Sequence, residues 1–116
     1  MQNFRNLLVW LKAHQLTLDV YAATSSFPKH EIYGITSQLR RSTSSVPTNI
    51  SEGAGKQTDR DFKRYLGISF GSACETEYLL FLSFELAYLP ETKYRELELK
   101  AIEVKRMLIG LMETLK

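Results

Sequence analysis

The sequence contains few residues that cross-link a chain or interrupt its secondary structure. A single cysteine, Cys74, excludes an intramolecular disulfide and suits a reducing compartment. Six glycines and three prolines in 116 residues exclude a collagen-like or disordered chain. The longest apolar stretch, residues 78–89, is interrupted by a serine and a glutamate and is too short to cross a bilayer. The opening residues do not resemble a secretion signal, so we expect a soluble, cytoplasmic protein with no membrane partner.

Groups for catalysis and metal binding are also scarce. The only histidines, His14 and His30, lie outside the Glu-x-x-His pairs that a di-metal helical bundle requires. Neither is placed in sequence to activate Cys74, so we interpret His14 as a packing residue and Cys74 as a small core residue. Residues 53–56, Gly-Ala-Gly-Lys, are too few for a phosphate-binding loop. We therefore expect no enzymatic activity, no metal ion and no cofactor.

The composition is that of one packed domain. Hydrophobic residues make up 44% of the chain and charged residues 24%. A chain of this length forms one domain, residues 1–116, and buries roughly 65% of the surface that its unfolded form exposes. The formal net charge is only +2. Attraction to a nucleic acid would therefore need a local cluster of cations, or a patch repeated in an oligomer.

Four segments carry apolar residues at helical spacing, and none alternates like a strand. They span about residues 6–24, 32–53, 58–89 and 90–115, with short connections between them. This pattern predicts an all-α, antiparallel up-down four-helix bundle. The predicted core positions of the third and fourth segments are Phe62, Leu66, Ser69, Ala73, Thr76 and Leu80, and then Tyr94, Leu97, Ala101, Val104, Leu108, Leu111 and Leu115.

Two features predict how the second and third segments meet. Pro47 lies inside the second segment and cannot donate a hydrogen bond to the Thr43 carbonyl, which hydroxyl groups at positions 42–45 could satisfy instead. Folding back near Gly55 would set residues 42–45 opposite residues 66–69. Both sets contain small residues, so we expect the two helices to approach closely there.

Apolar surface in excess of one core predicts self-association. The first segment has two apolar faces, and a helix that is apolar on two sides needs two partners. One face carries Leu7, Trp10, Leu11, Leu18, Tyr21 and Ala22, and the second carries Val9, Ala13, Leu16 and Val20. The end of the third segment, residues 78–88, is apolar almost all round. A chain this small cannot cover both, so we expect a homo-oligomer.

Several polar side chains lean inward on these helices. They could form a polar pocket, but we favour a paired network that fixes helix register or a subunit contact. Glu77 falls among apolar positions and should have a cationic partner, for which Lys105 and Arg106 are placed across the turn before Pro90. The predicted network consists of Arg41, Asn49, Glu52, Ser72, Glu75 and Glu77.

Basic residues cluster around the start of the third segment, at Lys56, Arg60, Lys63 and Arg64. Amide groups at a helix N-terminus also favour an anion such as a phosphate. Two aspartates dilute this cluster, so for a single subunit we favour a solvated helix end of mixed charge over nucleic-acid binding. Repetition of the cluster around an oligomer would favour nucleic-acid binding.

Several strings, spread over nearly the whole chain, resemble one bacterial family. They are WLKAHQL at 10–16, VY at 20–21, FP at 27–28, EIYG at 31–34, QLRRSTSSVPTNISEG at 38–53 and GS at 71–72, with Glu75 and Glu77. Together they resemble the four-helix bundle proteins encoded by intervening sequences in 23S ribosomal RNA genes. Ser42 and Ser51 stand where that family often has alanine, and both residues are small enough to keep the fold.

The resemblance implies an up-down bundle that forms a ring-shaped homopentamer. It also implies a relation to the accessory variability protein of diversity-generating retroelements, which is basic and works with a reverse transcriptase and a nucleic acid. No catalytic residues come with the family.

Two functional hypotheses follow, with a small-molecule or metal site in the bundle as a third. The first is a non-enzymatic oligomer that binds RNA or DNA through phosphate contacts, without reading bases. Its contact residues would be Arg40, Arg41, Lys56, Arg60, Lys63 and Arg64. The rival is a protein-interaction scaffold that binds no nucleic acid.

Overall fold

The computed structural model describes residues 2–116, and every regular element in that range is a helix. The prediction of an all-α chain with four helices is confirmed. Within these residues no helix combines the length and the apolar character needed to span a membrane. The elements are η1 (Phe4–Asn6), α1 (Leu8–Thr24), η2 (Lys29–Glu31), α2 (Ile35–Ala54), α3 (Asp59–Glu85) and α4 (Glu91–Thr114).

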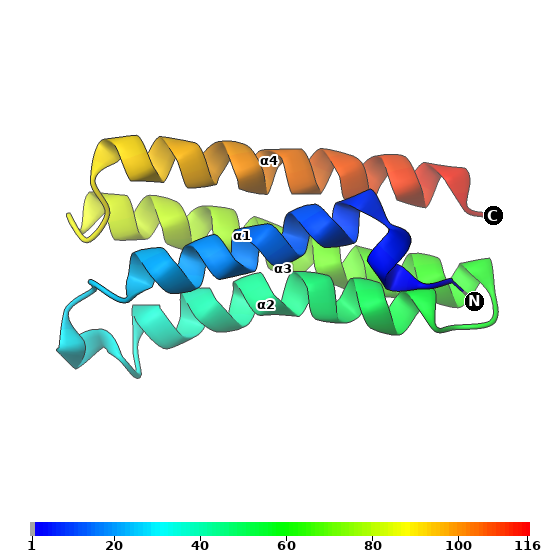
Figure 1. Cartoon of the computed structure of the whole chain (residues 1–116), viewed down its shortest axis with the longest axis horizontal. Helices are drawn as coiled ribbons and strands as arrows, with labels where there is room; N and C mark the ends of the chain where they lie inside the picture. Colours follow the sequence, from blue (N-terminus) through cyan, green and yellow to red (C-terminus); the bar gives the residue numbers. More distant parts are fainter. Residues whose placement is uncertain (1) are drawn as a thin grey trace.

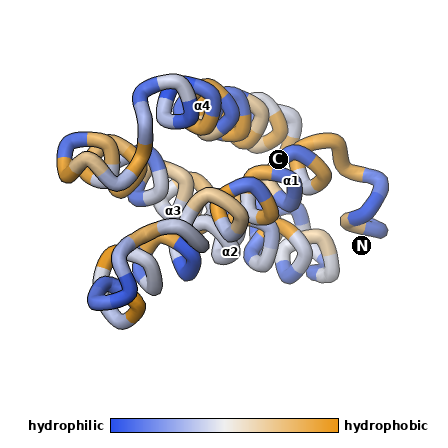
Figure 2. The backbone as a smooth tube through the Cα atoms, turned by 60° about the vertical axis from the view of Figure 1, so that its left-hand side comes forward, coloured by the Kyte–Doolittle hydropathy of each residue, from blue (hydrophilic) through white to orange (hydrophobic). Residues whose placement is uncertain are grey.

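The chain changes direction at each connection between the long helices (Figure 1). Both termini and the α2–α3 turn lie at one end of the molecule, while η2 and the α3–α4 turn lie at the other. Neighbours in sequence pack together, and α1 closes the arrangement by packing on α4. Figure 2 shows the four helices around a common centre, with hydrophobic and hydrophilic residues alternating along each of them. Helices α1 and α3 therefore occupy opposite corners of the bundle.

The core follows the helical repeat of each segment. On α1 the buried face is the one with Val9, Ala13, Leu16 and Val20, which leaves the other apolar face exposed. Every core position predicted for the third segment is buried. On α4 the first five predicted positions are buried, and the last two, near the end of the bundle, are half-buried. Burial of each large apolar side chain stabilises the fold by about 1.5–3 kcal/mol.

Three helix ends show what local sequence decides. Helix α3 begins as predicted, because Thr58 Oγ1 accepts a hydrogen bond from the Asp61 amide at 3.1 Å. It ends at Glu85 and not at Leu89, since Ala87 adopts a positive φ of 64°. The Tyr88 amide then bonds back to a carbonyl of the last turn, which satisfies the helix end. Helix α2 begins three residues later than predicted, and Ile32 lies exposed before it.

The α2–α3 contact differs in register from the prediction. Ser42 Oγ lies 3.0 Å from Thr76 Oγ1, and Ser72 Oγ donates to Ser45 Oγ at 3.0 Å. These partners on α3 lie about two turns further along than predicted. The connection is longer than assumed, running from Gly55 to Thr58. Side chains also lean toward the N-terminus of their own helix. Because the chain changes direction between α2 and α3, the two leans add together, so a side chain of α2 meets a residue of α3 that lies further from the turn.

Pro47 is buried within α2, and the helix runs unbroken through it. The Thr43 carbonyl, which lacks its usual donor because Pro47 has no amide hydrogen, accepts a bond from Thr17 Oγ1 of α1 at 3.3 Å. The prediction that a hydroxyl at 42–45 would fill this role is therefore wrong. The expected donors lie on α2 itself, whereas the observed donor lies on α1.

Candidate nucleic-acid interface

Four cations surround the α2–α3 turn at the end of the molecule that also holds both termini. Lys56 lies in the turn itself, and Arg60, Lys63 and Arg64 lie on the first two turns of α3. All four side chains are exposed. Among residues 2–116, none of them forms an ion pair, in contrast to most lysines and arginines of α4. Their charges are therefore available to an external anion.

An aromatic ring organises two of these cations. Lys56 Nζ lies 5.2 Å from the centre of the Tyr65 ring, and Arg64 Cζ lies 4.7 Å from it. The side chain of Tyr65 lies close to Gly53 at the end of α2. A Cβ atom on Gly53 would lie only 2.8 Å from the Tyr65 Cβ, so a residue without a side chain permits this close approach. Sequence reasoning missed Tyr65, although its position next to Arg64 was a usable signal.

Two carboxylates lie in the first turn of α3. Asp61 follows the capping residue Thr58 by three positions, and its main-chain amide is used by that cap. Asp59 Oδ2 accepts a hydrogen bond from the main-chain amide of Lys116 at 3.4 Å, which draws the end of α4 toward the turn. Acidic side chains at a helix N-terminus stabilise the helix, so both residues have a structural reason to be there.

The two remaining predicted contacts lie elsewhere. Arg40 Nε donates to Thr24 Oγ1 at 2.8 Å, and Arg41 pairs with Glu75 across 3.8 Å. Sixteen residues of helix and turn separate Arg40 from Lys56, a distance of about 24 Å. The six predicted residues therefore form no single patch. The predicted second helix already implied this separation, because Arg40 is near the start of α2 and Lys56 follows its end.

The predicted polar network is divided into separate groups. Asn49 Nδ2 donates to Ser45 Oγ at 3.0 Å, and Ser45 in turn accepts from Ser72, so these three join α2 to α3. Arg41 pairs with Glu75 at the surface, and Glu77 accepts from Lys105 Nζ at 2.8 Å. The expected cationic partner of Glu77 is thus present.

Two residues, Glu52 and Ser45, differ from the predicted network. Glu52 is exposed and has no side-chain partner among residues 2–116, so it belongs to none of these groups. Ser45, which the sequence analysis did not include, is the residue that links Asn49 to Ser72. Its small size at the helix contact was the available signal.

The groups that could support metal binding or catalysis are dispersed. Across residues 2–116, no three His, Cys, Asp or Glu side chains come close enough to hold a metal ion. His14 is exposed and stacks on Trp10, with ring centres 5.0 Å apart. Cys74 is half-buried on α3 rather than in the core, beside Tyr78 and Phe81.

The chain matches the sequence model of a known protein family over most of its length. The family model of the 23S rRNA-intervening sequence protein matches residues 5–110, which span η1 and nearly all of the four long helices. The chain belongs to this family. Comparison with curated proteins finds no match.

A solved structure agrees with membership of the 23S rRNA-intervening sequence protein family. The fold is similar to the crystal structure of a protein of unknown function from the S23 ribosomal protein family of Bacteroides thetaiotaomicron. The TM-score is 0.82, with 25% identity over 90% of this chain and 98% of that one. Within residues 2–116 of this chain, the α2–α3 turn brings together four exposed cations that form no ion pair in that range, and two of them, Lys56 and Arg64, lie over the Tyr65 ring.

Proposed function

We propose that this protein binds RNA or DNA through phosphate contacts at the α2–α3 turn, without enzymatic activity. The observation that carries the proposal is the group of four exposed cations, Lys56, Arg60, Lys63 and Arg64, none of which is neutralised by an ion pair among residues 2–116. Phosphate contacts of this kind supply affinity without base reading, because the phosphate backbone is the same for every sequence.

One turn offers few phosphate contacts, so the proposal includes assembly of several copies. The assembling unit would be an antiparallel up-down bundle, and the assembly a ring such as the homopentamer that the family resemblance implies. Each copy would add one basic turn, and repetition would convert a modest charge into a basic band. We place the assembly in the cytoplasm, where a reverse transcriptase is a candidate protein partner.

Two apolar faces support the proposed assembly. The outward face of α1 exposes Leu8, Leu11 and Leu18, at helical spacing. The outward face of α3 exposes Tyr78 and Phe81, and continues toward the turn through Cys74, Gly71 and Gly67. Because α1 and α3 occupy opposite corners, the face of one copy could pack against the unlike face of the next. Such unlike contacts generate rings when the rotation closes.

Titration of labelled structured RNA and duplex DNA with nuclease-treated protein would test nucleic-acid binding. We expect fluorescence anisotropy to report binding that weakens steeply with salt, because bound phosphates release counterions. Arg60→Glu should abolish binding. Arg106→Glu is the matched control, since it reverses an exposed arginine of α4 that also has no ion pair among residues 2–116. Equal losses in both variants, or no binding at low salt, would contradict the proposal.

Light scattering would test assembly separately. Leu18→Glu places a charge on the outward face of α1 and should reduce the molar mass to that of one chain. Leu99→Glu changes a more exposed leucine of α4 that belongs to neither proposed face, and should leave the molar mass unchanged. A single-chain mass for the unaltered protein would rule out the ring.

The exposed apolar faces also support a second candidate function, a protein-interaction scaffold without nucleic-acid binding. This alternative predicts that Arg60→Glu leaves capture of a protein partner intact, whereas Leu18→Glu removes it. The two charge variants therefore distinguish a basic ring from a scaffold.

A further inference from the structure

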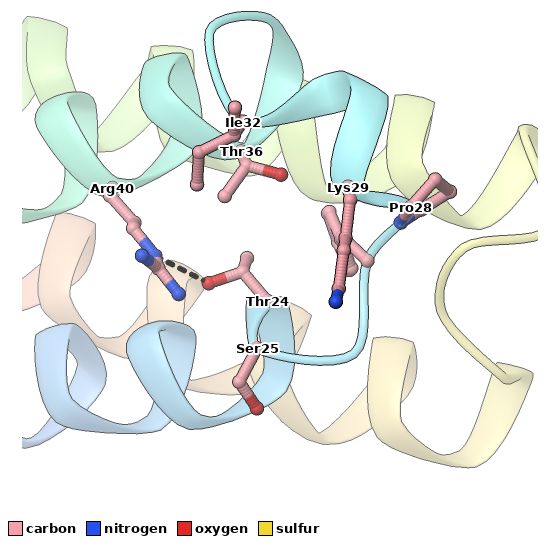
Figure 3. A pocket seen from close by; sticks show the side chains of 8 residues that line it. Thr24, Ser25, Pro28, Lys29, Ile32, Thr36 and Arg40 are labelled. Atoms are coloured by element: carbon pink, nitrogen blue, oxygen red, sulfur yellow. Dashed lines mark hydrogen bonds between the residues drawn. The ribbon is translucent and has the colours of Figure 1, made fainter.

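A cleft opens at the end of the bundle opposite the basic turn, where α1 passes through η2 into α2. Its volume is about 350 Å³, within the range of sites that hold small molecules. Apolar side chains from the connecting segment, Phe27, Pro28 and Ile32, line part of it. Figure 3 shows polar side chains entering from several directions, with Arg40 and Lys29 on opposite sides of the space.

Thr36 is the most informative residue of this cleft. Its side chain is only 3% exposed, yet its Oγ1 has no hydrogen-bond partner within residues 2–116, and no other buried side-chain oxygen or nitrogen in that range shares this condition. The hydroxyl lies on the cleft side of α2 (Figure 3). A buried hydroxyl without a partner is costly, so such groups call for an explanation. The Oγ1 atom itself is shielded from solvent, so a rotation of the Thr36 side chain about its Cα–Cβ bond would turn the hydroxyl toward a ligand group in the cleft, which would supply the missing partner.

Arg40 is fixed in place without being neutralised. Its Nε donates to Thr24 Oγ1 at 2.8 Å, and its Cζ lies 4.7 Å from the centre of the Tyr21 ring. These contacts orient the guanidinium and leave other N–H groups of Arg40 available to donate to a ligand. Among residues 2–116, no carboxylate pairs with it. Glu31, the acidic residue closest to Arg40 in sequence, instead accepts a hydrogen bond from Tyr88 Oη at 2.8 Å.

We propose that this cleft binds a small organic anion, with a carboxylate or phosphate head and an apolar body. The head would pair with Arg40, whose planar fork matches either group, and would accept a hydrogen bond from Thr36. The Lys29 ammonium on the opposite side adds a second positive charge. The apolar body would cover Phe27 and Ile32. This site is independent of the proposed nucleic-acid interface, because the two lie at opposite ends of the bundle (Figure 1).

Phenylacetate and phenyl phosphate are suitable probes, because each joins an anionic head to an apolar ring. We expect saturable binding by calorimetry, with NMR shift changes confined to Thr24, Ile32, Thr36 and their neighbours. Benzyl alcohol, which lacks the charge, should bind at least about tenfold more weakly, since it cannot form charge-assisted hydrogen bonds with Arg40.

Two variants locate the binding groups. Arg40→Gln should weaken binding of either anion at least about tenfold. Thr36→Val keeps the shape of the side chain and removes the hydroxyl, so it should weaken binding while the melting temperature holds or rises. Arg60→Gln, at the other end of the bundle, is the matched control and should bind the probes normally.

Several outcomes would overturn the cleft proposal. These are absence of saturable binding, equal affinity for benzyl alcohol, or probe binding that Arg40→Gln leaves unchanged. If Arg40→Gln unfolds, the response of Thr36→Val and the location of the shifts decide the question. Absence of nucleic-acid binding by the unaltered protein would leave these results unaffected, so the two proposals can fail separately.

Discussion

Lys105 Nζ donates a hydrogen bond to Glu77 Oε1 over 2.8 Å and so joins the middle of α4 to α3. Both side chains are mostly shielded from solvent, with 27% and 31% of their surfaces exposed. The same ammonium lies 5.6 Å from the centre of the Phe70 ring. Arg41 and Glu75 form a contrasting pair, since they lie 3.8 Å apart with 68% and 44% of their side chains exposed.

These two ion pairs should differ in strength. In a double-mutant cycle we expect Glu77→Gln and Lys105→Gln to reveal a coupling of about 1 kcal/mol, the upper end for pairs near a surface. The same cycle on Glu75→Gln and Arg41→Gln should give a coupling near zero, because water screens that pair. Urea denaturation measures both. Equal couplings for the two pairs would show that shielding from solvent does not determine their strength.

The protein should lose stability in alkali. Burial and the hydrogen bond to Glu98 raise the pKa of Tyr94 from 10.0 to about 12. Hydrogen bonds to carboxylates likewise raise the pKa values of Lys100 and Lys105 above 10.5. Each group holds its proton more tightly when folded, so its contribution is full below the ordinary pKa and is lost as pH rises through the folded one. The free energy of unfolding should therefore fall from about pH 10 upward.

Tyr94→Phe isolates one part of this effect. Without the phenol, the decline between pH 10.0 and about 12 should become shallower, although the variant also loses the bond to Glu98. Urea denaturation across this range provides the measurement. An unchanged slope would mean that Tyr94 takes no part in the alkaline transition.

Thr36→Val should leave the fold unchanged or more stable. Removing a buried hydroxyl that lacks a partner avoids a desolvation cost of about 1–3 kcal/mol. Thr43→Val is the matched control on the same helix, because the Thr43 hydroxyl donates to the Leu39 carbonyl at 2.7 Å. That variant should lose about 1 kcal/mol in thermal or urea denaturation. Equal effects would show that Thr36 is satisfied in solution.

Gly67 and Gly71 provide a test of where copies meet. A Cβ atom at either position would find no neighbour within 4 Å, so alanine fits the single chain without strain. Each substitution should stabilise the helix by about 0.5–1 kcal/mol. If the next copy packs closely on this face, the double alanine variant should nevertheless assemble more weakly. Gly110→Ala, equally open on α4, should gain the helix stability and keep the assembly. Unaltered assembly of the double variant would place the contact elsewhere.

Most of the fold could be predicted because its signals are local. The step of three and four residues along α4 marks the buried face wherever the partner helix lies, since helical geometry alone aligns those positions. Thr58 likewise caps α3 through an amide only three residues away. These features depend on neighbours in sequence, and the structure confirms them.

Less of the candidate site could be predicted, because its parts lie on different helices. The contact of Arg40 with Thr24 depends on how α1 packs on α2, and the contact of Lys56 with Tyr65 depends on how the α2–α3 turn folds back. The α2–α3 register was also misjudged, since it depends on turn length and side-chain lean. None of these follows from the spacing of residues within one segment.

The sequence by itself determined the class of the fold, the four helices and the buried faces of α3 and α4, because periodicity and capping act over a few residues. Tertiary structure decided several polar partners that residue spacing could not predict. Thr17 reaches the carbonyl that Pro47 leaves free, and Ser42 meets Thr76. It also decided that Thr36 has no partner and that Arg40 faces a cleft, since both facts depend on how the η2 connection sets α1 against α2.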